Sequence, residues 1–160
     1  MHQSIAMLAD MYKINTRIFT IIVDSLDPDK LQETPLDKGT SAHWMIGHTV
    51  ASRFTIARNL GLDETPEWAS LFERGAPDED REKYPSLDEL KQAWAEISPK
   101  ILSRFEEITE EELLKTPSFE FEGLEKSARG IVNFLYFHES YHLGQLAYFG
   151  RLTGGQQLFG

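Results

Sequence analysis

The chain has 160 residues, of which 41% are hydrophobic, and this is the size of one domain with a sizeable core. Its formal net charge of −10 excludes a nucleic-acid-binding surface, which needs basic residues to displace counterions from phosphate. The sequence contains no cysteine, which excludes disulfides, cysteine-ligated zinc and a cysteine nucleophile.

Four segments have the three- and four-residue spacing of apolar side chains that is typical of helices. The first runs from about Ser4 to Leu26, and the loop DPDKLQETPLDKGT follows it. The second begins at Thr40 or Ser41, either of which can cap it, and ends near residues 59–61.

The longest irregular stretch, residues 62–85, contains large apolar side chains, so we expect it to pack on the domain as a lid or short helix. The third helix starts at the capping box Ser86-Leu-Asp-Glu89, and Pro99 is expected to kink it. The fourth begins near Ser127 and stops at residues 154–155. Together these elements predict an all-α fold.

We expect a single domain over residues 1–160, built as an up-and-down four-helix bundle with a long irregular connection between helices two and three. An irregular helical domain is the alternative. Neither a signal peptide nor an apolar run of membrane-spanning length is recognisable in the sequence.

The segment HESYHLGQL, residues 138–146, contains the pattern H-E-x-x-H. At 100° per residue, His138 and His142 lie about 40° apart on the most apolar face of their helix, beside Ile131 and Leu135. Buried imidazoles need polar partners, because an unpaired buried polar group costs about 1–3 kcal/mol. A shared metal ion is one such partner, and hydrogen-bonded core neighbours are the other.

A third ligand would have to come from another helix. His43 and His48 lie about 140° apart around the second helix, so they cannot share a face. We prefer His48, because the small residues Ala51, Ser52 and Thr55 on its side leave room for a cavity, and His43 is the runner-up. In an up-and-down bundle the second and fourth helices run parallel on opposite corners, and the three histidines can share one layer.

Two interpretations of H-E-x-x-H fail. A protease takes its third zinc ligand from downstream of the motif, but the tail LGQLAYFGRLTGGQQLFG has no His, Asp or Glu. A di-iron bundle needs two Glu-x-x-His motifs, and the chain has only Glu139 to His142. Glu139 is then either a general base or, as we prefer, a solvated acid near the bundle edge, and Tyr141 is expected in the core.

Three short segments resemble the signatures of the DinB-like superfamily: Trp44-Met-Ile-Gly-His48, His138-Glu-Ser-Tyr-His142-Leu-Gly-Gln145 and Arg151-Leu-Thr-Gly154. The resemblance implies a four-helix bundle that holds one divalent metal ion, often nickel or zinc, with His48, His138 and His142. The activities known in that family imply a thiol-dependent transferase or isomerase, with a low-molecular-weight thiol as a co-substrate.

Two classes of function therefore stay open. One is a metal-dependent transferase or hydrolase acting on a small thiol or electrophile, in which Gln145 orders a bound water or a ligand imidazole. The other is a non-catalytic metal-binding or stress-associated bundle. In both cases we expect a cytoplasmic protein without nucleic-acid or membrane partners; its expected partners are a small molecule and a second copy in a homodimer.

Overall fold

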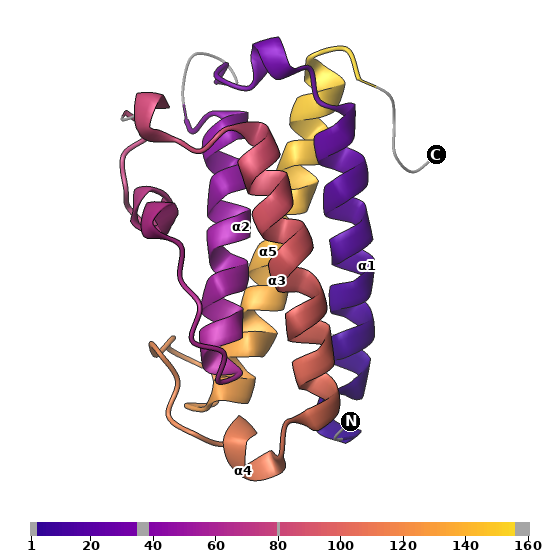
Figure 1. The fold of residues 1–160 in the computed structure, drawn as a ribbon, viewed down its shortest axis with the longest axis vertical. Helices are drawn as coiled ribbons and strands as arrows, with labels where there is room; N and C mark the ends of the chain where they lie inside the picture. The colour runs from indigo at the N-terminus through magenta and orange to yellow at the C-terminus, as the bar shows by residue number, and fades with distance from the viewer. Residues whose placement is uncertain (1–2, 35–38, 80, 156–160) are drawn as a thin grey trace.

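Four long helices pack side by side in the computed structural model, which describes residues 3–34, 39–79 and 81–155 (Figure 1). They are α1 (Gln3–Ser25), α2 (Ala42–Asn59), α3 (Leu87–Glu107) and α5 (Ala128–Leu152). The shorter elements are η1 (Pro28–Lys30), η3 (Glu67–Phe72), η4 (Arg81–Lys83) and α4 (Glu110–Leu113). The described ranges contain no strand, so the predicted all-α helical bundle is confirmed.

The helices begin where hydroxyl side chains can cap them. Ser41 Oγ accepts a hydrogen bond from the Trp44 backbone N–H, and Ser86 forms the predicted reciprocal capping box with Glu89. The α3 helix continues through Pro99 as one element. The single-turn helix α4, which the sequence analysis missed, follows it.

The order of the helices around the bundle differs from the expected one. Figure 1 shows the chain rising along α1, descending along α2, returning to the top before α3, descending along α3 and rising along α5. Helix α5 therefore runs antiparallel to α2 and packs directly against both α2 and α1. The parallel, diagonal placement expected for the second and fourth long helices is wrong, because the long connection is itself long enough to span the bundle.

Helix α2 is the most deeply buried element. Helices α3 and α5 and the segment η3 all pack on it, and every residue from 41 to 54 is buried. The segment 62–85 attaches through Phe72, which is completely buried. Its ring lies so close to Gly47 that a Cβ atom there would be 2.3 Å from Phe72 Cε1. The glycine thus allows η3 to lie against α2.

None of the helices within the described ranges combines the length and the apolar character that crossing a bilayer would require.

Candidate metal centre

Three histidine side chains converge where α2 contacts α5. The Nε2 atoms of His48 and His142 each lie 3.1 Å from His138 Nε2. One ring nitrogen from each residue lies within 4.8 Å of the other two, and among the described residues this is the only cluster of three potential metal ligands with such spacing. The structure thus brings together the three residues that the sequence analysis selected.

The outer ring nitrogens of two histidines have partners that fix their protonation. His48 Nδ1 donates to the Phe72 carbonyl oxygen at 2.5 Å, and His142 Nδ1 donates to Gln145 Oε1 at 2.7 Å. A neutral imidazole carries a single N–H, so both rings present a lone pair at Nε2. These two lone pairs point toward His138 Nε2.

His138 alone cannot provide a hydrogen-bond donor for both of these lone pairs. Its Nδ1 is buried and has no hydrogen-bond partner among the described residues. If His138 carries its proton on Nε2, this single N–H must be shared between the lone pairs of His48 and His142. If the proton is on Nδ1, the three Nε2 atoms have lone pairs that face one another. A cation between the three Nε2 atoms accepts all three pairs, so this donor set fits a metal ion.

Burial keeps the cluster neutral. Desolvation lowers the pKa of His138 and of His142 to about 4, and the neighbouring histidines contribute in the same direction. Desolvation also lowers the pKa of His48, against the opposing effect of its hydrogen bond to Phe72. Because a histidine ligand must be unprotonated, the rings are in the metal-binding form at neutral pH.

His43, the runner-up ligand, is engaged elsewhere. Its Nε2 donates to the Pro85 carbonyl oxygen, and its Nδ1 accepts from Gln32 Nε2, both at 2.8 Å. These bonds tie the start of α2 to the two connections that flank it. His43 therefore has a structural role and stays outside the cluster.

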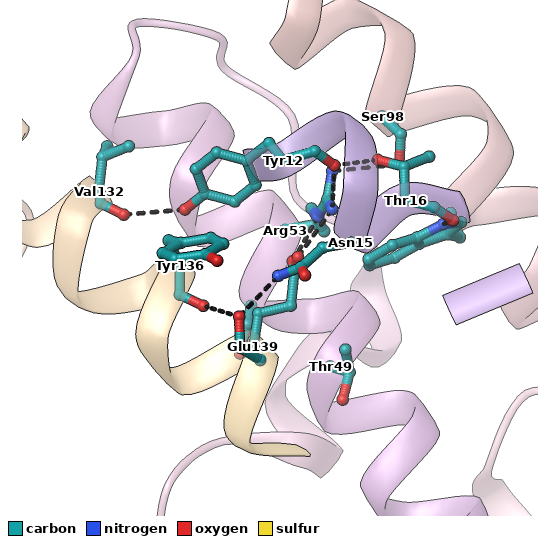
Figure 2. A network of polar contacts seen from close by, with 12 residues as sticks. Tyr12, Asn15, Thr16, Thr49, Arg53, Ser98, Val132, Tyr136 and Glu139 are labelled. Atoms are coloured by element: carbon teal, nitrogen blue, oxygen red, sulfur yellow. Dashed lines mark hydrogen bonds and ion pairs between the residues drawn. The ribbon is translucent and has the colours of Figure 1, made fainter. Parts of the chain in front are cut away.

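Glu139 is neither a base beside the histidines nor a solvated acid, so both expectations are wrong. Its side chain is completely buried and forms a two-point ion pair with Arg53, whose side chain is also completely buried (Figure 2). Arg53 Nε donates to one carboxylate oxygen, and Nη2 donates to the other at 2.8 Å. Because Glu139 lies about 100° around α5 from His138, it points into the bundle where α2 supplies this guanidinium.

The Arg53 side chain connects all four long helices. From α2 it donates to Glu139 in α5, and at 3.4 Å to both Ser98 Oγ in α3 and the Tyr12 carbonyl oxygen in α1. The guanidinium also lies 4.0 Å from the ring centroid of Trp94. Sequence reasoning missed this residue, although an arginine within the otherwise apolar and small run of α2 was the available signal.

Gln145 lies beside His142 as predicted, but Tyr141 is not in the core. The Tyr141 side chain is 56% exposed, and its hydroxyl accepts a hydrogen bond from Gln145 Nε2 at 3.2 Å. A chain of hydrogen bonds therefore runs from the surface at Tyr141 through Gln145 to His142.

The segment 62–85 orients a histidine. Its contribution is the Phe72 carbonyl that holds His48 Nδ1. Sequence reasoning had no signal for this group, since every residue carries a backbone carbonyl.

The fold is similar to that of a known structure, and the sequence matches a family model. The chain is similar to the crystal structure of a DinB-like protein, YjoA, from Bacillus subtilis, with a TM-score of 0.66 and 18% identity over 96% of each chain. No curated protein matches the sequence. The family model of the DinB superfamily matches residues 11–146, which include all three histidines. This chain belongs to the DinB superfamily.

Proposed function

We propose that His48, His138 and His142 bind one divalent metal ion through their Nε2 atoms. The observation that carries the proposal is the convergence of these three nitrogens, two of which are fixed as lone-pair donors by their Nδ1 bonds. Such outer partners orient a ligand ring and raise its basicity. In this proposal the Phe72 carbonyl orients the ring of His48, and Gln145 orients the ring of His142.

Nickel or zinc is the proposed metal. Neutral imidazoles suit both ions, and the family resemblance favours the same pair. Three protein ligands leave at least one coordination position for a small molecule, as in catalytic zinc sites. His138 and His142 are only partly buried, which supports access from solvent.

We propose that the chain is a metal-dependent transferase or hydrolase that acts on a small thiol or an electrophile. A divalent ion at this position supplies a Lewis acid that lowers the pKa of a bound water or thiol. The side chains around the cluster shape the space available to the substrate. Trp44 stacks on His48 at a centroid distance of 4.7 Å, and Phe134 lies 6.0 Å from His138.

The environment of Glu139 argues against proteolysis. In H-E-x-x-H proteases the glutamate is the general base, whereas here its carboxylate is paired with Arg53 inside the bundle. The third ligand comes from a different helix upstream, which supports a site within a bundle that takes small molecules.

Metal content tests whether the three histidines bind an ion. Elemental analysis of purified protein should find about one nickel or zinc ion per chain, and His138→Ala should lose it. His43→Ala is the matched control, because it removes a buried histidine from α2 outside the cluster and should retain the metal. Equal metal content in wild type and His138→Ala would refute the site.

Activity separates the proposed enzyme from a non-catalytic metal-binding bundle. Metal-loaded protein would be incubated with unstructured casein and, separately, with a small thiol and an electrophilic acceptor. We expect metal-dependent consumption of the thiol and intact casein. Casein cleavage that requires the metal and disappears in His138→Ala would restore the protease, and inactivity in both assays would favour the non-catalytic bundle.

A further inference from the structure

A cavity lies at the lower end of the bundle in Figure 1, where α2 and α3 end and α5 begins. It has a volume of about 260 Å³, and its lining includes residues 58–61 at the end of α2 and residues 115–118. Arg58 lies ten residues after His48 on α2, which is about 15 Å along the helix axis. The cavity is therefore separate from the histidine cluster.

Hydrogen bonds between different elements hold the walls of this cavity. The Asn59 side chain, at the end of α2, donates to Ser118 Oγ and accepts from the Ser118 backbone N–H, both at 2.9 Å. Arg104 Nε donates to the Leu60 carbonyl oxygen at 2.8 Å, which ties α3 to the end of α2. The walls are thus in place before a ligand arrives, and a preformed site avoids much of the entropic cost of ordering them on binding.

Positive charge is concentrated around the cavity. Its lining includes three cationic side chains, Arg58, Arg104 and Lys115, and one carboxylate, Glu112. The chain as a whole has a net charge of −10, so an excess of cations is not a general property of its surface. A cavity with such an excess attracts anions.

Glu112 pairs with only one of the three cations. Its Oε1 accepts from Arg104 Nη2 at 2.5 Å. Arg58 donates to the hydroxyls of two threonines, and the Lys115 ammonium forms no hydrogen bond or ion pair with any residue that the structure describes. Within the described ranges, two positive charges at this cavity therefore lack a carboxylate partner.

These features define the charge and size of a suitable ligand. A dianion would balance the two unpaired cations, and guanidinium groups bind phosphate and carboxylate oxygens with good geometry. Ala128, the first residue of the 25-residue helix α5, also lines the cavity, so the positive end of the helix dipole adds to the attraction. The volume lies just below the range of roughly 300–1,000 Å³ for drug-sized ligands, which favours a small molecule.

We propose that this cavity binds a small dianion, such as a phosphate ester or a dicarboxylate, through Arg58, Arg104 and Lys115. The bound anion would hold together the ends of α2 and α3 and the start of α5, because all three line the cavity. The proposal does not depend on metal binding or on any reaction at the histidines.

Isothermal titration calorimetry with inorganic phosphate and, separately, with succinate tests the site. The titrations would be made at low ionic strength, which limits screening, and in mildly alkaline buffer, where phosphate is a dianion. We expect about one anion to bind per chain, and the probe that binds more tightly identifies the ligand class. His138→Ala should bind this probe as well as wild type does, because the cavity is separate from the histidine cluster.

Substitutions at the cavity test which groups bind the anion. Arg58→Gln and Lys115→Gln should each weaken binding about tenfold, as expected for the loss of a hydrogen bond between charged groups. Lys126→Gln is the matched control, because Lys126 pairs with Glu120 at 2.7 Å and does not line the cavity, and it should bind like wild type. Failure of folded wild type to bind either probe, wild-type affinity in Lys115→Gln, or an equal loss in Lys126→Gln would overturn the proposal.

Discussion

A single charged side chain organises the centre of the bundle. Arg53 lies in the most buried helix, yet its donors reach a carboxylate, a hydroxyl and a backbone carbonyl on three other helices (Figure 2). Burying a guanidinium is tolerated only when its donors are satisfied and its charge is paired. Glu139 provides the pairing, so each member of this ion pair depends on the other.

Removing Arg53 should therefore lower the free energy of unfolding by more than the loss of its own hydrogen bonds would. Arg53→Met leaves the Glu139 carboxylate buried without a counter-charge, and we expect a loss of about 3–5 kcal/mol in the free energy of unfolding, measured with urea. The double variant Arg53→Met/Glu139→Leu removes both charges and should recover much of that loss. A double variant that is as unstable as the single one would contradict this account.

An ion pair on the surface provides the control for the Arg53→Met measurement. Lys100 Nζ lies 2.7 Å from Glu64 Oε2, and both side chains are substantially exposed, at 48% and 38%. Solvent screens such pairs, so Lys100→Met should change the free energy of unfolding by less than about 1 kcal/mol.

At the scale of elements, the contact between η3 and α2 connects packing to the histidine cluster. Phe72 fills the space above Gly47, and the carbonyl of the same residue holds His48 Nδ1. Helical glycines are normally unfavourable by about 1 kcal/mol relative to alanine, and at Gly47 the close approach of the Phe72 ring offsets this cost.

Gly47→Ala should separate η3 from α2. The new methyl group collides with the Phe72 ring, and overpacking of this kind costs about 1–3 kcal/mol. We expect lower stability by urea unfolding and weaker metal binding by titration, because His48 loses its fixed orientation. In a Phe72→Ala background the collision is absent, so the same Gly47→Ala change should become neutral or stabilising. Additive effects of the two substitutions would show that the ring and the glycine do not interact.

The sequence was informative wherever the relevant signal was local. Helical phase placed His138 and His142 on one face, and the Ser86 capping box fixed the start of α3. The partners of Glu139 and His48 were not predictable in this way, because Arg53 and the Phe72 carbonyl are brought near only by tertiary packing. The antiparallel relation of α2 and α5 was missed for the same reason: periodicity defines a helix but not the direction in which a long connection returns.

At the scale of the whole molecule, the histidine cluster and the Arg53–Glu139 pair are two links between the same helices. His48 and Arg53 lie five residues apart on α2, and their partners His138 and Glu139 are adjacent on α5. A metal ion in the cluster would fix the register of α2 against α5 at a second point, close to the first. Metal binding would then stabilise the packed bundle as a whole.

Metal should therefore raise the melting temperature of the wild-type protein. An ion that binds only the folded state at a free concentration 100 times its Kd adds about 2.7 kcal/mol, which corresponds to roughly 5–11 °C for a domain of this size. Differential scanning calorimetry with nickel or zinc, and then with chelator, measures the shift. His48→Ala removes the only ligand on α2, so the ion can no longer bridge the two helices and the chelator should have little effect. Identical melting of metal-loaded and chelated wild type would show that no ion links α2 to α5, whereas an equal shift in His48→Ala would place the ion elsewhere.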